Sequence, residues 1–226
     1  MDLSRGRQLH KQALDAQESG NFEEALKLID SAMIAYANDN DDSSFAEAHA
    51  MRYLTLNHLY QQLGFKGWQV SAKFTVEAGV ELARQSGDKK TLGITLFHLA
   101  KTLEDLSELD EASKLYKESL NNLSGDEANI ENIKNHMEVC AYKAGDIQAI
   151  DRAEADLNKL LEVGDDLEYN HQVWISGGYL RIANALRERD RVKAKEFLDK
   201  ARVYIDAHPD LKLRKEQLVK LESLFS

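Results

Sequence analysis

The chain is poor in residues that interrupt helices or cross-link small folds. It has one proline and twelve glycines among 226 residues, so long stretches run without a helix breaker. Its single cysteine, Cys140, cannot form an intramolecular disulfide, which is typical of proteins from a reducing compartment. We therefore expect a cytoplasmic protein.

Long hydrophobic runs are also missing. The opening MDLSRGRQLH has no apolar core of a signal peptide, and no run of about eighteen apolar residues occurs. These absences predict neither export nor a membrane partner. The formal net charge of −10 argues against general affinity for nucleic acid. Residues 181–226 nevertheless hold 12 Lys/Arg against 8 Asp/Glu, whereas residues 1–180 hold 17 against 31.

Motifs for catalysis and metal binding are absent. The sequence has no glycine-rich phosphate loop, no CxxC and no HExxH. The acidic stretch 38–44 lacks the glycine and the closing glutamate of a calcium loop. His136 and Cys140 share a helical face, but two ligands without a third are better interpreted as core residues. We expect no enzymatic activity, no cofactor and no metal; a cleft holding perturbed carboxylates or histidines would indicate an enzyme instead.

The residues that are abundant, Ala, Leu, Glu and Lys, favour helix nearly everywhere. In residues 96–120, apolar side chains recur at helical spacing on both sides of the polar link 104–108. A link this short makes the two helices antiparallel neighbours. This stretch therefore predicts a helical hairpin, and the rest of the chain repeats its pattern.

Five such hairpins are predicted, with their turns at Gly20, Gly64, Ser107, Gly145 and Arg189. Asp88 is expected to cap the first helix of the third hairpin, and the fourth hairpin is expected to begin near Asp126. Ser44 to Glu47 has the pattern of a capping box that opens the second. A final helix over 211–225, with Leu211, Leu218, Leu221 and Phe225 on one face, has no partner and is expected to cap the stack.

The hairpins resemble tetratricopeptide repeats. Leu96, Leu99, Ala100, Leu103, Ala112 and Tyr116 occupy the pattern W-x2-L-G-x2-Y…A-x3-F, although the spacing between turns exceeds the standard 34 residues. The resemblance implies an all-α, right-handed superhelical solenoid of antiparallel helix hairpins. It predicts about five TPR-like repeats plus a C-terminal capping helix, forming one domain over residues 1–226.

The resemblance also implies a binding site, because partners of this family usually bind the concave wall formed by the first helices. Carrying over the groove positions gives the partner-binding candidates Arg7, His10, His58, Gln61, Phe97, Lys101, Asn132, Asn135 and Tyr142. Amides such as Asn132 and Asn135 can hydrogen-bond an extended peptide backbone. His10 and Leu14 replace the Lys/Asn pair with which some family members grip a terminal carboxylate, which argues against that mode.

We therefore expect a non-enzymatic scaffold or adaptor that binds a protein or peptide and is a monomer or weak homodimer. An alternative is a sensor module for a small signalling peptide or metabolite. A rival site is the basic segment 187–195, where Arg187, Arg189, Arg191, Lys193 and Lys195 could meet an acidic partner or the acidic half of a second copy.

Overall fold

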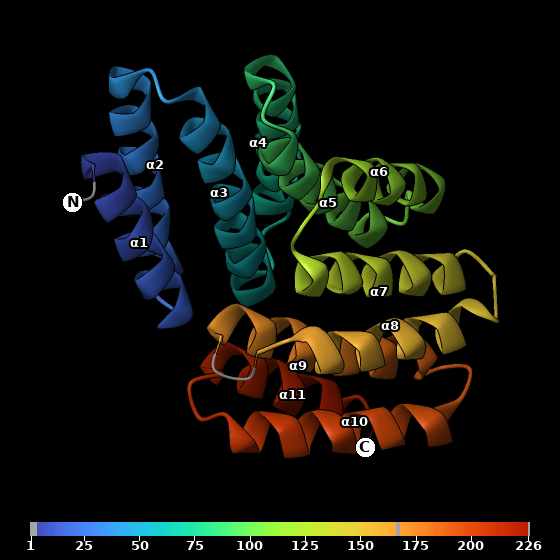
Figure 1. Ribbon diagram of the computed structural model, residues 1–226. Helices are drawn as coiled ribbons and strands as arrows, with labels where there is room; N and C mark the ends of the chain where they lie inside the picture. The colour runs from blue at the N-terminus through green and yellow to red at the C-terminus, as the bar shows by residue number, and fades with distance from the viewer. Residues whose placement is uncertain (1–3, 166–167, 226) are drawn as a thin grey trace. The chain divides into compact units, whose positions relative to one another are not determined.

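Helices are the regular elements of this protein. The computed structural model describes residues 4–165 and 168–225, and in that part of the chain it contains eleven α-helices and no strand (Figure 1). They are α1 (Arg5–Glu18), α2 (Phe22–Asp39), α3 (Asp42–Leu63), α4 (Lys66–Ser86), α5 (Lys89–Asp105), α6 (Leu109–Asn122), α7 (Glu127–Lys143), α8 (Ala149–Val163), α9 (Tyr169–Leu186), α10 (Arg191–Ala207) and α11 (Lys212–Ser223). The all-α prediction is confirmed.

The helices group into two compact units. Residues 1–123 form the amino-terminal unit and residues 124–226 form the carboxy-terminal unit. The pairs α1/α2, α3/α4 and α5/α6 are hairpins of the first unit, and α7/α8 and α9/α10 are hairpins of the second. The five predicted hairpins are therefore all present. A single domain over residues 1–226 stays a prediction.

In the amino-terminal unit, consecutive first helices pack on one another. Besides the contacts within each hairpin, α3 packs against both α1 and α5 (Figure 1). Tyr36, Ile29, Tyr53 and Leu56 are almost completely buried in its core. Burying one such large side chain stabilises the fold by about 1.5 to 3 kcal/mol. The apolar stripes that predicted the helices are thus the faces that hold this unit together.

Helices α3 and α4 approach each other closely where α4 carries a glycine. A Cβ atom added to Gly79 on α4 would lie 2.8 Å from the Cβ of His49 on α3. Real Cβ atoms do not come this close, so only glycine allows the two helices to approach at this level.

The turns follow from residues that accept a positive φ angle. Gly20 and Gly64 have φ values of +75° and +69° at the first two turns, and Ser107 has +64° at the third. Serine rarely adopts this conformation, which costs free energy that glycine does not.

Helix α3 begins earlier than predicted. Its N-cap is Asp41, whose carboxylate accepts a hydrogen bond from the backbone N–H of Ser44. The capping box predicted at Ser44 to Glu47 is therefore wrong by one turn: aspartate caps as well as serine does, and Asn40 already takes the left-handed conformation that ends α2. The cap predicted at Asp88 is confirmed, and the fourth hairpin begins as predicted near Asp126, which is the N-cap of α7.

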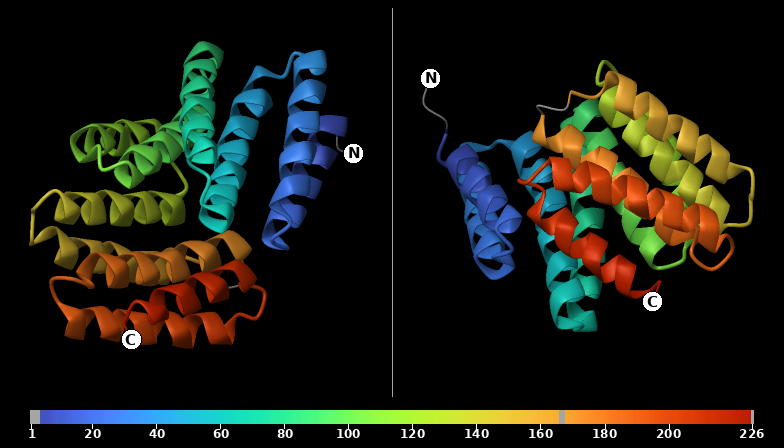
Figure 2. Two further views of the ribbon diagram at one scale, coloured as in Figure 1. Left: turned by 180° about the vertical axis from the view of Figure 1, so that it is seen from behind. Right: turned by 90° about the horizontal axis from the view of Figure 1, so that it is seen from below.

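The carboxy-terminal unit has one continuous apolar core, to which all of its helices contribute. Helix α11 packs on α9 and α10 (Figure 2). Its predicted apolar stripe is buried: Leu211, Leu218, Leu221 and Phe225 are each at most 9% exposed. The predicted capping helix is confirmed.

None of the helices in residues 4–165 and 168–225 combines the length and hydropathy of a membrane span.

Candidate functional site

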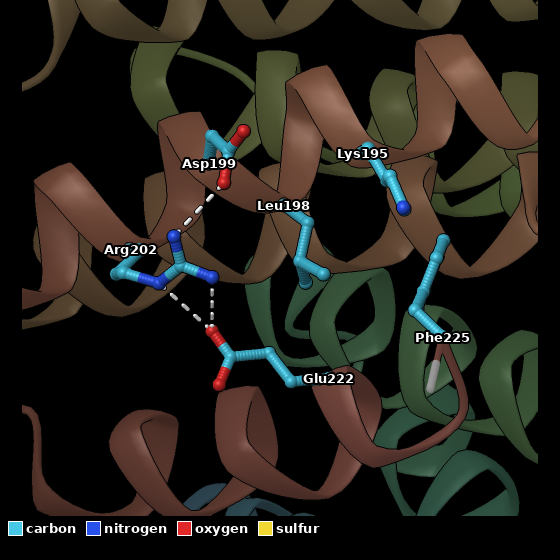
Figure 3. Close-up of a pocket in the computed structure, with 6 residues that line it drawn as sticks. All are labelled: Lys195, Leu198, Asp199, Arg202, Glu222 and Phe225. Carbon is cyan, nitrogen blue, oxygen red and sulfur yellow. Dashed lines mark hydrogen bonds and ion pairs between the residues drawn. The ribbon is translucent and has the colours of Figure 1, made fainter.

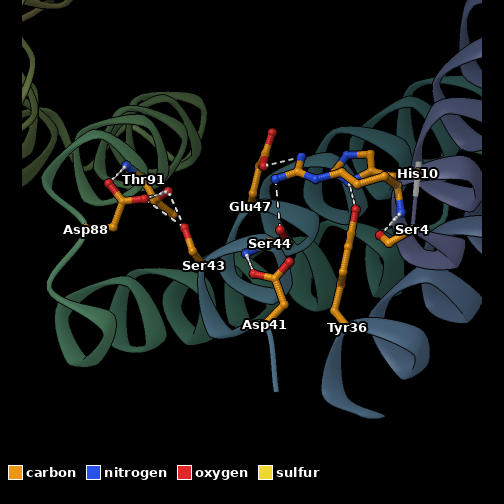
Figure 4. Close-up of polar contacts among 10 residues, drawn as sticks. Ser4, His10, Tyr36, Asp41, Ser43, Ser44, Glu47, Asp88 and Thr91 are labelled. Carbon is orange, nitrogen blue, oxygen red and sulfur yellow. Dashed lines mark hydrogen bonds and ion pairs between the residues drawn. The ribbon is translucent and has the colours of Figure 1, made fainter. Parts of the chain in front are cut away.

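In the amino-terminal unit, Arg7 on α1 links this helix to α3. The Arg7 guanidinium donates to the Glu47 carboxylate at 2.9 Å and to the Ser44 hydroxyl at 2.8 Å (Figure 4). It also lies over the ring of Tyr36, 5.8 Å from its centroid. Arg7 and Glu47 are both more than 40% exposed. The pair therefore positions α1 against α3 and still presents charge to solvent.

His10 lies one turn further along α1 and meets the same tyrosine. Its Nδ1 is 3.2 Å from the Tyr36 hydroxyl (Figure 4). Burial raises the pKa of Tyr36 to about 12, with Arg7 acting against it. Burial also lowers the pKa of His10, against the effect of Glu47. At neutral pH this contact is thus a hydrogen bond between a neutral imidazole and a neutral phenol.

A second polar cluster links the start of α3 to the start of α5. Ser43 donates to the Asp88 carboxylate at 2.7 Å, and the Thr91 hydroxyl donates to the same oxygen at 2.9 Å (Figure 4). These hydrogen bonds lower the pKa of Asp88. Asp88 is also the N-cap of α5, so one carboxylate caps a helix and positions it beside its neighbour.

His58 and Gln61 lie one turn apart near the carboxyl end of α3. The His58 ring stacks on Phe22 of α2, with centroids 4.8 Å apart and planes 10° apart. Gln61 is exposed. On α5, the Lys101 ammonium lies 5.4 Å from the centroid of Phe97. Phe97 itself is only 7% exposed, so Lys101 covers a ring that belongs to the core.

Two histidines of this unit are buried in a way that the sequence did not indicate. Both ring nitrogens of His49, and the Nδ1 of His98, are buried without a hydrogen-bond partner in the described part of the chain. Burial, followed by the nearby Arg52, lowers the pKa of His49 to about 4. Burial and then Lys101 lower the pKa of His98 to about 3. Helical spacing alone could not distinguish these two from exposed histidines.

The three candidates on α7 are used inside the carboxy-terminal unit. Asn135 is fully buried; its amide donates to the backbone oxygen of Ala153 at 2.6 Å and accepts a hydrogen bond from Arg181. Asn132 is 2% exposed and Tyr142 is 3% exposed. The Asn135 amide thus bonds a backbone carbonyl, as predicted for a bound peptide, but the carbonyl belongs to this chain.

The basic segment 187–195 is also largely used internally. Arg189 lies over the ring of Tyr142 and donates to its backbone oxygen, and Arg191 does the same with Phe225. Lys193 pairs with Asp151 and Glu154, and Arg187 pairs with Glu188. Lys195 has no ion pair with a described residue, and Arg189 and Arg191 bond a backbone oxygen and a ring rather than a carboxylate.

Acidic residues gather between α7 and α8. Burial, followed by Glu131 and Glu138, raises the pKa of Asp156 to about 6. Among residues 4–165 and 168–225, no three His, Cys, Asp or Glu side chains are placed to hold a metal ion. His136 and Cys140 are both buried on α7.

The structure thus divides the nine predicted residues. Five remain exposed or half-buried on the first helices of the amino-terminal unit: Arg7, His10, His58, Gln61 and Lys101. We refer to these five as the first-helix residues. They supply cations, imidazoles and an amide, a mixture suited to hydrogen bonds and ion pairs with a polypeptide.

Comparison with known proteins identifies the fold. No protein-family model and no curated protein matches the sequence. Among solved structures, the TPR-like repeats of a putative kinesin light chain from Podosopora anserina superimpose with a TM-score of 0.57 at 16% identity, covering 92% of this chain and 99% of that one. BtubC (BKLC) from P. vanneervenii gives a TM-score of 0.60 at 18% identity, covering 89% and 80%. Since these identities are low, the likeness concerns the fold: the chain has the fold of tetratricopeptide-like helical-repeat proteins, as its residues predicted.

Proposed function

We propose that this protein is a non-enzymatic scaffold that binds a protein or peptide through the first-helix residues of its amino-terminal unit. One observation carries the proposal. Helices α1, α3 and α5 pack on one another in succession, and each still presents at least one predicted contact residue to solvent.

The chemistry of these side chains supports binding of a polypeptide with polar groups. Gln61 offers both a donor and an acceptor, His10 and His58 are half-buried imidazoles, and Lys101 places a cation on an aromatic ring. A few such residues usually supply most of the binding energy of an interface. Cytoplasmic location and a monomeric or weakly dimeric state stay predictions.

The test is affinity capture from cell extract with the full chain. The bait variant is Gln61→Ala combined with Lys101→Ala, which removes an amide on α3 and a cation on α5. The control is Gln85→Ala combined with Lys117→Ala, which removes the same two groups from exposed positions on the second helices α4 and α6.

The proposal predicts a protein that wild type and control retain and the Gln61→Ala/Lys101→Ala variant loses, by mass spectrometry of the captured material. Retention of the same proteins by all three baits, or loss from the control as well, would contradict it. Circular dichroism of each bait shows whether a loss reflects unfolding.

A further inference from the structure

A small cavity lies between α10 and α11 of the carboxy-terminal unit. Its volume is about 320 Å³, at the lower end of the range for ligand sites. It is lined by Lys195, Leu198, Asp199, Arg202, Glu222 and Phe225. Lys195, Leu198 and Arg202 extend from α10 towards α11, and Glu222 and Phe225 face them (Figure 3).

Ion pairs close one end of the cavity. The Arg202 guanidinium donates twice to one oxygen of Glu222, at 2.9 and 2.7 Å, and once to Asp199 at 2.9 Å (Figure 3). Both carboxylates of the lining are therefore bound to the same cation. Three of the five N–H donors of Arg202 are used in this way.

At the other end, Lys195 has no such partner. No ion pair or hydrogen bond joins its ammonium to a residue of the described chain, and none is drawn in Figure 3. The lining carries two cations and two carboxylates; both carboxylates are ion-paired with Arg202, and the ammonium of Lys195 has no ion pair with a described residue. Between these ends, Leu198 and Phe225 form an apolar floor, each at most 9% exposed.

The dimensions match a short piece of polypeptide. Lys195 and Arg202 are seven residues apart on one helix, which separates them by about 10 Å along its axis. Three residues of extended chain span about the same distance. The cavity therefore has room for an apolar side chain over its floor and an acidic side chain at the ammonium.

We propose that this cavity binds a peptide segment that carries an acidic residue beside an apolar one. Lys195 binds the carboxylate, Leu198 and Phe225 contact the apolar side chain, and Arg202 donates to a backbone oxygen of the peptide. The site uses residues of the carboxy-terminal unit only, so it stands independently of the function proposed for the first-helix residues.

The test is a titration of the full ¹⁵N-labelled chain, followed by amide chemical shifts. The probe is the tripeptide acetyl-Leu-Glu-Leu-amide; acetyl-Leu-Gln-Leu-amide removes its charge and acetyl-Gly-Glu-Gly-amide removes its apolar side chains. The proposal predicts shifts in α10 and α11 with the first peptide. It also predicts that each altered peptide binds about fivefold more weakly, as expected for loss of one exposed ion pair or a modest apolar contact.

The matched variants are Lys195→Ala, at the cavity, and Lys220→Ala, an exposed lysine of α11 outside its lining. Both change the net charge equally, but only Lys195→Ala is expected to weaken binding, by about fivefold. The proposal is overturned if wild type shows no shift in α10 and α11, if both variants bind alike, or if the glutamine peptide binds as well as the glutamate peptide. It is equally overturned if sodium acetate alone reproduces the shifts, because the cavity would then bind any carboxylate.

Discussion

The two units repeat one hairpin pattern but use the polar side chains of their first helices in opposite ways. In the amino-terminal unit, Arg7 and Gln61 keep substantial exposure. In the carboxy-terminal unit, Asn135 is fully buried and bonds α8 and α9. Polar side chains on first helices are thus exposed in one unit and buried in hydrogen bonds within the fold in the other.

Acidification is expected to cause the largest difference in stability between the two units. The pKa values of His49 and His98 lie at about 4 and 3, below the 6.5 of unfolded histidine. As pH falls below 6.5, the unfolded chain binds protons that these folded histidines do not, so the amino-terminal unit loses stability. Between pH 7 and pH 5 we expect a loss on the order of 2 kcal/mol for His98, and less for the more accessible His49.

Tryptophan fluorescence can monitor the unfolding of each unit separately, because Trp68 lies on α4 and Trp174 on α9. In urea titrations, the Trp174→Phe variant reports the amino-terminal unit and the Trp68→Phe variant reports the carboxy-terminal one. Adding His98→Gln to Trp174→Phe is expected to flatten the pH dependence. Equal pH dependence at both tryptophans would contradict this assignment.

Asn135→Ala tests the internal use of the α7 amides. The substitution removes the buried amide that bonds the Ala153 carbonyl and Arg181, and we expect it to lower the unfolding free energy of the carboxy-terminal unit by about 2 kcal/mol. Gln61→Ala, at an exposed site, should change stability by less than about 0.5 kcal/mol. Urea unfolding with Trp174 as the probe measures the first value, and Trp68 measures the second. Two equally small effects would show that the units do not differ in this way.

Asp156→Asn is expected to stabilise the carboxy-terminal unit at pH 7. Burial and the neighbouring Glu131 and Glu138 raise the pKa of Asp156 from 3.8 to about 6, so this carboxyl group costs stability at any pH above 3.8, and the cost is complete above pH 6. After allowance for solvent screening, the gain should be below about 1 kcal/mol. It should fall to about half by pH 5 and disappear only below the ordinary pKa of 3.8, where the aspartate is protonated in both the folded and the unfolded chain. Thermal unfolding at pH 7, 5 and 3 checks this, and a gain of the same size at pH 3 would exclude the charge as its cause.

Ser107→Gly is expected to have the smallest effect, a gain of about 0.5 kcal/mol in the amino-terminal unit. Ser107 adopts φ +64°, which glycine accepts without strain, although glycine also loses more entropy on folding. The reciprocal Gly64→Ser should cost about 1 kcal/mol at the equivalent turn. Urea unfolding with Trp68 as the probe compares the two, and changes of the same sign would contradict the conformational explanation.

Most of the fold could be predicted because it follows from local patterns. Turns at Gly20 and Gly64 interrupt helical periodicity, and Asp88 caps the helix that follows it. The buried stripe of α11 could be predicted because Leu218 and Leu221 recur at helical spacing. The start of α3 was missed because Asp41 and Ser44 are equally good caps, and local propensity does not choose between them.

The candidate site was less predictable because accessibility depends on distant partners. Asn135 bonds Ala153 and Arg181, the latter 46 positions away along the chain. Nothing in the local sequence distinguishes such an asparagine from one that faces solvent. The contact between Arg7 and Glu47, which are 40 positions apart, was equally invisible.

The most direct test of the account is photo-crosslinking from defined positions. A photoreactive phenylalanine analogue replaces Gln61 on α3 in one sample and Gln85 on α4 in another, and both full chains are irradiated in cell extract. Binding through the first-helix residues predicts a partner protein crosslinked from position 61 and not from position 85. Crosslinking of the same protein from position 85 alone, or equally from both positions, would contradict it.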